Sequence, residues 1–93
     1  MKYLKHKHSS KIFIITADKE YCVNLETKEI SKRGTTGLKY DHKETDRKNY
    51  RIIDRKTMLS YFKRNSIRLT SEVEALLNVQ LHVIYEYRLF SNL

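Results

Sequence analysis

The sequence predicts a small single-domain α+β fold, with an N-terminal antiparallel β-meander, one or two short helices, and a C-terminal strand or helix packing on the sheet. Short β-branched and alternating runs fill the first third of the chain, and apolar residues recur at helical spacing further on. The 93 residues leave room for one hydrophobic core, so residues 1–93 are expected to form one domain. A hydrophobic share of 40% is too high for a disordered chain.

The meander is predicted between residues 11 and 33. Residues 11–17 (KIFIITA) form an apolar, β-branched run that is typical of a mostly buried strand. A polar turn follows, and residues 20–25 then alternate between apolar and polar. One face of this second run carries Tyr21, Val23 and Leu25. The two runs predict a hairpin, and residues 30–33 predict a short third strand at an edge.

Two segments are expected to lack regular structure. Residues 1–10 are basic and terminal, so we expect them to fray. Residues 34–49 form a long basic loop with only Leu38 and Tyr40 as apolar anchors. Connections of this length are uncommon in compact domains and tend to be functional, so this loop is the first place to look for a binding surface.

The helical part begins after a predicted strand at residues 50–53. Asp54 is a good N-cap, and Met58 and Phe62 then recur at helical spacing toward Arg64. A second helix is predicted from Ser71, because Ser71 and Glu74 have the spacing of a capping box.

The C-terminal segment, residues 79–90, fits either of two structures. Alternation of apolar and polar residues favours a strand, whereas a stripe from Val73 through Leu81 to Arg88 fits a helix that continues from Ser71. If the segment is an uncovered edge strand, it is a candidate interface for a homodimer.

The predicted core draws on all of these elements. Its members are Ile12, Ile14, Val23, Leu25, Ile52, Met58, Leu59, Phe62, Leu76, Leu77, Leu81 and Val83.

Several classes of protein are excluded by composition. No apolar run approaches the roughly 20 residues of a membrane-spanning helix, so no membrane partner is expected. The apolar stretch at residues 12–15 is shorter than the roughly 7–15 residues of a signal-peptide core, so we expect a cytoplasmic protein. The lone cysteine, Cys22, cannot form an internal disulfide and is interpreted as a buried, inert thiol.

The charge is unevenly distributed along the chain. The formal net charge is +8; residues 1–68 hold eighteen basic and eight acidic residues, whereas residues 69–93 hold one basic and three acidic residues. A positive field of this kind attracts polyanions, because each neutralised phosphate releases counterions. Four tyrosines lie among the basic residues and offer rings for base stacking, although core packing is the simpler explanation for most of them. These are Tyr3, Tyr40, Tyr50 and Tyr61.

The candidate nucleic-acid contacts are the basic residues of the third strand, the long loop and the first long helix with its flanks. They are Lys32, Arg33, Lys39, Lys43, Arg47, Lys48, Arg51, Arg55, Lys56, Lys63, Arg64 and Arg68. On a helix, Arg55, Lys56, Lys63 and Arg64 form two pairs two turns apart on one side. The alternative interpretation is that these are ordinary solvated charges.

No residue pattern predicts catalysis, a metal or a cofactor. His6 and His8 have a spacing that suits two ligands on a strand, but the neighbouring lysines repel a cation and a closed site needs four ligands. The set for RNA cleavage (Asp41, His42, Asp46, Arg47 and Lys48) is contiguous in one loop and lacks the rigid frame that catalysis requires.

The sequence therefore predicts a non-enzymatic module that binds DNA or RNA through phosphates with little sequence specificity. Two other hypotheses remain. One is a small inhibitor or adaptor, of the kind that phages and plasmids carry, which docks on an acidic surface of a nucleic-acid-handling protein. The other is a small ribonuclease.

Overall fold

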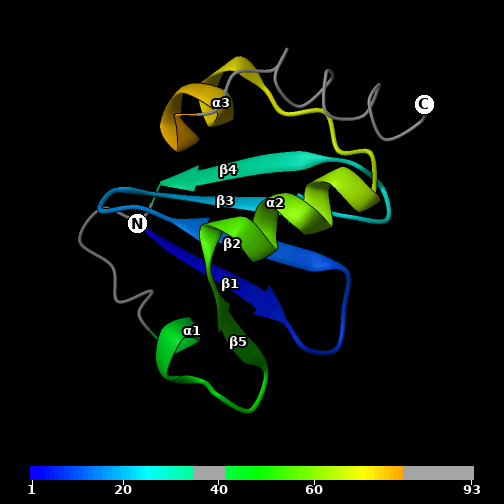
Figure 1. Cartoon of the computed structure of the whole chain (residues 1–93). Coiled ribbons are helices and arrows are strands. Elements are labelled where there is room, and N and C mark those ends of the chain that lie inside the picture. Colours follow the sequence, from blue (N-terminus) through cyan, green and yellow to red (C-terminus); the bar gives the residue numbers. More distant parts are fainter. Residues whose placement is uncertain (35–41, 79–93) are drawn as a thin grey trace.

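The fold of this α+β domain is an antiparallel sheet with helices packed on it, as a computed structural model shows (Figure 1). The structure describes residues 1–34 and 42–78, except the side chains of His42 and Glu44. Five strands pair in the order β4-β3-β2-β1-β5, and every pairing is antiparallel. The strands are β1 (Lys2–His6), β2 (Lys11–Ile15), β3 (Lys19–Asn24), β4 (Ile30–Gly34) and β5 (Tyr50–Ile53). The helices are α1 (His42–Thr45), α2 (Arg55–Arg64) and α3 (Ser71–Leu77).

The meander forms as the alternation predicts. β2 pairs with β3 so that Ile12 lies opposite Val23 and Ile14 opposite Tyr21, and all four side chains are buried under the helices. β4 is an edge strand, which confirms the prediction for residues 30–33.

The prediction that residues 1–10 fray is wrong. β1 lies inside the sheet, where β2 and β5 supply hydrogen-bond partners on its two sides. Leu4 of this strand is fully buried between Phe13 of β2 and Ile52 of β5 in the register. β1 is held by strand pairing on both of its edges. The basic sequence of residues 1–10 alone does not predict this pairing.

The expectation of an unstructured connection over residues 34–49 is also wrong in part. Residues 42–45 form the short helix α1, and the carbonyl of Asp46 then accepts the N–H groups of Asn49 and Tyr50 in a turn. The N–H of Lys7 donates to the carbonyl of Asn49 over 2.8 Å and extends the pairing of β1 with this segment. Residues 35–41 of the predicted loop lie outside the described residues.

The helix boundaries follow their caps. Asp54 caps α2 by accepting the N–H of Thr57 over 2.7 Å, which confirms the predicted cap. The cap of α3 is Thr70, whose hydroxyl accepts the N–H of Val73, so the predicted capping box of Ser71 and Glu74 is wrong by one residue. With Val73 at the third helical position, no acidic side chain stands where a capping box requires one.

The main core lies between the sheet and the layer formed by α2, α3 and the segment that joins them. Most of the predicted core is buried there, with Leu59 and Leu76 partly buried at its margin. Ile52 is an error: it is 44% exposed, whereas Ile53 is buried, because neighbouring strand residues point to opposite faces. Tyr21, Ile53, Ile67, Leu69 and Val73 complete this cluster. Leu81 and Val83 lie outside the described residues, as does the predicted segment at 79–90 with its strand, helix and dimer alternatives.

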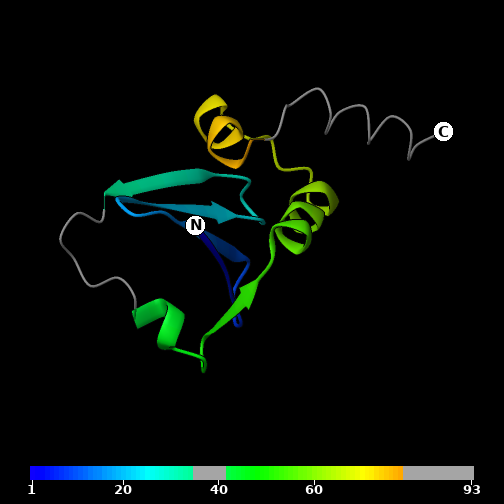
Figure 2. The ribbon, with the colours of Figure 1, turned by 60° about the vertical axis from the view of Figure 1, so that its left-hand side comes forward.

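The opposite face of the sheet carries a smaller cluster of Leu4, Phe13 and Ile15, with Cys22 and Tyr50 packed against it. Figure 2 shows α2 and α1 on different sides of the sheet, with α1 beside β5. None of the helices in the described part of the chain has the length and apolar character to cross a bilayer.

Candidate functional site

Three of the predicted contact residues form ion pairs with two carboxylates in the fold. Lys32 Nζ lies 3.0 Å from Glu72 Oε1 and joins β4 to α3. Arg33 donates to Glu20 Oε2 over 2.6 Å, and Lys43 donates to Glu20 Oε1. Two carboxylates face three cations here, so much but not all of the positive charge of Lys32, Arg33 and Lys43 is compensated within the protein.

Glu20 is almost completely buried, with 4% of its surface exposed. Lys43, which pairs with it, is 12% exposed at its side chain, and its ammonium lies 4.4 Å from the centre of the Phe13 ring. A buried carboxylate is costly unless cations and hydrogen bonds compensate for its lost hydration. Glu20, Arg33 and Lys43 therefore form a structural ion cluster that ties α1 and β4 to β3.

A second group of cations surrounds Tyr61, and we call Lys5, Arg51, Tyr61 and Arg64 the Tyr61 cluster. Arg51 Nη2 donates to the Tyr61 hydroxyl over 2.9 Å. The guanidinium carbon of Arg64 lies 4.9 Å from the centre of the Tyr61 ring, and Lys5 Nζ lies 5.9 Å from it. Both distances are within the range of cation–π attraction. One tyrosine thus organises three positive side chains.

Three elements place these side chains together. Lys5 and Arg51 lie directly opposite each other in the pairing of β1 with β5. Tyr61 and Arg64 are three residues apart on α2, a spacing that makes them neighbours on one helix face. Asp54 alone separates β5 from α2, so the strand and helix are held close by a short connection.

The carboxylates that the structure places form no ion pair with Lys5, Arg51 or Arg64. The ammonium of Lys5 donates to the backbone carbonyls of His6 and Ser9 over 2.7 and 2.6 Å. Because its donors are engaged in this way, Lys5 contributes mainly positive charge to the cluster. Arg51 and Arg64 are exposed, and each retains N–H donors beyond its contact with Tyr61.

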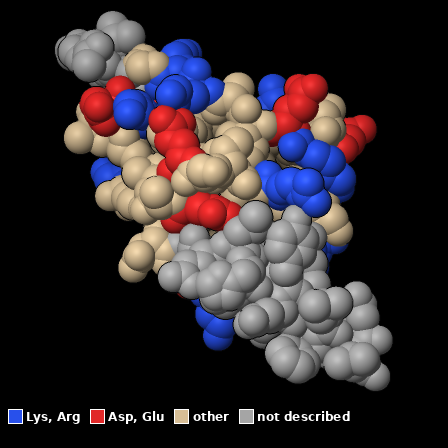
Figure 3. All heavy atoms as spheres, turned by 90° about the horizontal axis from the view of Figure 1, so that it is seen from above, with Lys and Arg blue, Asp and Glu red and all other residues tan. Residues whose placement is uncertain are grey.

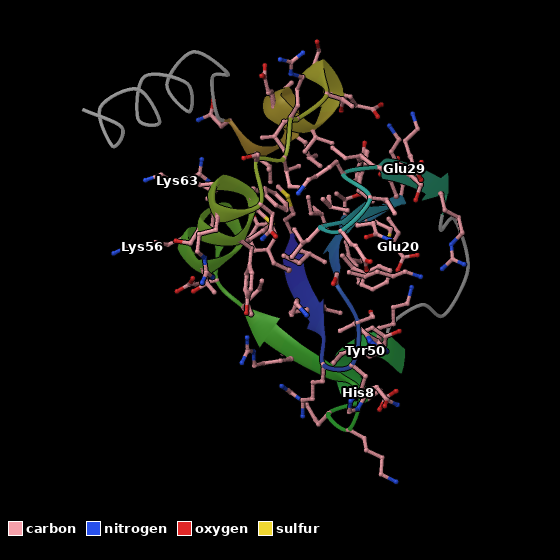
Figure 4. All side chains as sticks on the ribbon, turned by 90° about the vertical axis from the view of Figure 1, so that its right-hand side faces the viewer. His8, Glu20, Glu29, Tyr50, Lys56 and Lys63 are labelled. Atoms are coloured by element: carbon pink, nitrogen blue, oxygen red, sulfur yellow. The ribbon has the colours of Figure 1, made fainter. Side chains whose placement is uncertain are left out.

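Two further lysines extend the positive charge along α2. Figure 4 shows Lys56 and Lys63 projecting outward from α2, on the side of the molecule away from Glu20 and Glu29. Figure 3, which views the α3 and β4 side from above, shows basic and acidic side chains next to each other. Lys56 and Lys63 therefore add positive charge to the α2 side, where Asp54 at the start of the helix is an acid close to Lys56.

The remaining predicted contacts are dispersed. Arg55 donates to the carbonyl of Leu77 over 2.8 Å and so joins the start of α2 to the end of α3. Arg47 and Lys48 are exposed in the turn before β5, and Arg68 is exposed after α2. Lys39 lies outside the described residues.

The described tyrosines offer few open rings for base stacking. Tyr21 is 2% exposed, and its burial raises the pKa of its hydroxyl. Tyr50 packs edge-on against His6 and Phe13, with ring centres 5.1 and 5.7 Å away, and burial raises its pKa too. Tyr3 packs against the main core, and Arg64 covers the ring of Tyr61.

Cys22 is a half-buried free thiol. Burial is the main cause of its raised pKa, with the carboxylate of Glu20 adding to it.

The other candidate groups are engaged in local structure. Nδ1 of His6 lies 2.9 Å from the Ser9 hydroxyl and accepts the N–H of His8. Asp46, from the set considered for RNA cleavage, accepts hydrogen bonds from Asn49, whereas Asp41 and the side chain of His42 are outside the described part. Within that part, no three histidine, cysteine or acidic residues gather as a metal site would need.

Lys5 and the organising role of Tyr61 are the features of the cluster that the sequence does not predict. Lys5 is overlooked because residues 1–10 are expected to fray. The available signal is the apolar neighbour Leu4, which places Tyr3 and Lys5 on a common face if the segment is a strand.

Comparison with protein-family models, with curated proteins and with solved structures gives no significant match to this chain.

Proposed function

We propose that the chain is a small non-enzymatic binding module that engages DNA or RNA through backbone phosphates, with little sequence specificity. The observation that carries this proposal is the Tyr61 cluster, in which three cations converge without a carboxylate partner among the placed side chains.

The arrangement is unfavourable for the protein alone. Like charges that are held together repel one another and destabilise the compact state. Elsewhere in the same fold, Lys32 pairs with Glu72, and Arg33 and Lys43 share the carboxylate of Glu20. A polyanion that supplies the missing negative charge would relieve the repulsion at Arg51 and Arg64, and this relief adds to the counterions that phosphates release.

The geometry also favours phosphates over bases. Arg51 is on a strand and Arg64 is on a helix, so both guanidiniums are carried by regular structure. Arginine forms strong, charge-assisted hydrogen bonds to phosphate oxygens. Because Arg64 lies over the ring of Tyr61, the cluster presents charge and hydrogen-bond donors on that face of the ring.

Fluorescence anisotropy tests the proposal, with labelled duplex and single-stranded DNA and RNA of unrelated sequences and salt raised from low to physiological concentration. The expected result is binding to each unrelated sequence with similar affinity. On logarithmic axes, affinity should fall with salt at a slope of roughly −2 to −4, as two to four phosphate contacts would give.

Two results would overturn the proposal. The first is an absence of binding to all four probes at low salt, which would leave an acidic protein surface as the partner to test. The second is strong preference for one sequence at constant salt, because phosphate contacts carry no sequence information.

A further inference from the structure

We infer that the hydroxyl of Tyr61 is itself a phosphate ligand, and that it donates its proton to an oxygen held at the same time by Arg51. This inference rests on the proposed function and specifies the chemistry of the same site.

The hydrogen-bond inventory of Tyr61 carries the argument. A phenol both donates and accepts. The Tyr61 oxygen accepts from Arg51 Nη2 over 2.9 Å, so the hydroxyl proton points elsewhere. No acceptor for that proton occurs among the placed side chains and backbone groups. The hydroxyl therefore retains a donor beside a guanidinium that also has donors left over.

The positions of the two arginines define what fits the site. The donors of Arg51 and the hydroxyl proton lie within one hydrogen-bond length of each other, so both can reach one tetrahedral oxyanion. Arg64 lies over the ring, where it adds positive charge next to the same group. A carboxylate side chain of this protein could have balanced these charges, but the placed carboxylates are elsewhere. The geometry fits a phosphate group of DNA or RNA.

The substitution Tyr61→Phe separates the hydroxyl from the ring. Phenylalanine preserves the aromatic face under Arg64 and removes only the hydroxyl. Tyr50→Phe is the matched control, because Tyr50 is on β5 next to Arg51 but its ring packs against Phe13 on the opposite face of the sheet. Affinity for a duplex without terminal phosphates is measured as a function of salt for both variants and the wild type.

The expected result is a loss of about tenfold in affinity for Tyr61→Phe at every salt concentration, the size expected for a hydrogen bond to a charged group. The salt slope should equal that of the wild type, because no cation is removed. Tyr50→Phe should bind like the wild type. A duplex with 5′-phosphates distinguishes the sources of phosphate: equal loss on both duplexes identifies internal phosphodiesters, and loss confined to the phosphorylated duplex identifies the terminal group.

Unchanged affinity of Tyr61→Phe for both duplexes would overturn the inference while leaving the proposed function intact. So would a slope that becomes shallower by about one unit, because the hydroxyl would then act only by holding Arg51 in place. Failure of the proposed function is distinct, since the wild-type protein itself would then not bind.

Discussion

Arg51 of β5 donates a hydrogen bond to the hydroxyl of Tyr61 on α2, ten residues further along the chain, over 2.9 Å. The contact joins an edge strand to the helix that packs next to it and brings a guanidinium close to Lys5 and Arg64. The contact is exposed, so the hydrogen bond contributes little to stability, and the positive charge of Arg51 remains available to a ligand.

Loss of this contact should therefore leave the fold nearly unchanged. For Arg51→Gln we expect the free energy of unfolding to stay within about 0.5 kcal/mol of the wild type, because relief of repulsion offsets the lost hydrogen bond. Urea unfolding followed by circular dichroism measures this. A loss of several kcal/mol would show that Arg51 is a structural residue.

The buried position of β1 predicts a large difference between two apolar residues that lie opposite each other. Leu4 is fully buried and Ile52 is 44% exposed. Leu4→Ala should cost about 3 kcal/mol, whereas Ile52→Ala should cost well under half as much, because only the first leaves a cavity. Equal effects in urea unfolding would contradict the position of β1 within the sheet.

The ion cluster around Glu20 predicts that the stability of the fold depends strongly on the Glu20 carboxylate. Glu20→Gln leaves Lys43 buried without a negative partner, and the expected loss of stability is about 3 kcal/mol. This figure is at the low end of the range for broken buried pairs, because the side chain of Arg33 is 64% exposed and can be solvated. The matched control is Glu29→Gln, at an exposed acid just before β4, which should unfold like the wild type. An unchanged free energy of unfolding for Glu20→Gln would show that the stability of the fold does not depend on the ion cluster.

The exposed ion pair of Lys32 and Glu72 should stabilise the fold only within a limited range of pH. The hydrogen bond from Lys32 lowers the pKa of Glu72 below its ordinary value of 4.5, so the stabilisation is complete above that value and is lost as the pH falls through the lowered pKa. The same hydrogen bond raises the pKa of Lys32 above 10.5, so the stabilisation is lost again as the pH rises through the raised value. The difference in melting temperature between wild type and Glu72→Gln should be small, present between these limits and absent outside them.

Burial predicts that the thiol of Cys22 reacts slowly with alkylating reagents. Its pKa is raised from 9.0 mainly by desolvation, so less thiolate is present at neutral pH than for an exposed cysteine. Alkylation by iodoacetamide at pH 7.5, followed by mass spectrometry, should be slower in the native protein than in urea. Equal rates under the two conditions would show that the face of the sheet carrying Cys22 is open to reagents.

Local patterns account for the parts of this fold that the sequence predicts. The strands at Lys11–Ile15 and Lys19–Asn24 follow from β-branched content and alternation, which depend only on neighbouring residues. The cap at Asp54 is likewise a local contact, with Thr57 three residues away. Such features need no knowledge of the tertiary structure.

Long-range pairing determines what the sequence does not predict. β1 contains a single aliphatic residue, Leu4, and becomes a strand because β2 and β5 pair with it on both sides. The choice of Ile53 over Ile52 as the core residue depends on which face of β5 meets α2, since a shift by one residue exchanges the faces.

Long-range pairing of the strands also decides which basic residues meet carboxylates and which do not. The sequence predicts a broad patch from Lys32 to Arg68, but it cannot show which cations meet carboxylates. Glu20 pairs with Arg33 and Lys43 only because β3, β4 and α1 converge. Lys5 approaches Tyr61 only because β1 pairs with β5.

The most direct test of the Tyr61 cluster is the salt dependence of nucleic-acid binding by the double variant Arg51→Gln, Arg64→Gln. Lys11→Gln is the control, because Lys11 is exposed on β2 and shares a strand face with Phe13, on the side of the sheet opposite the cluster. Removal of two phosphate-binding cations should make the slope of log affinity against log salt shallower by about two units and weaken binding to all sequences alike. Lys11→Gln should retain the wild-type slope. A double variant that keeps the wild-type slope and affinity would contradict the assignment of the binding site to this cluster.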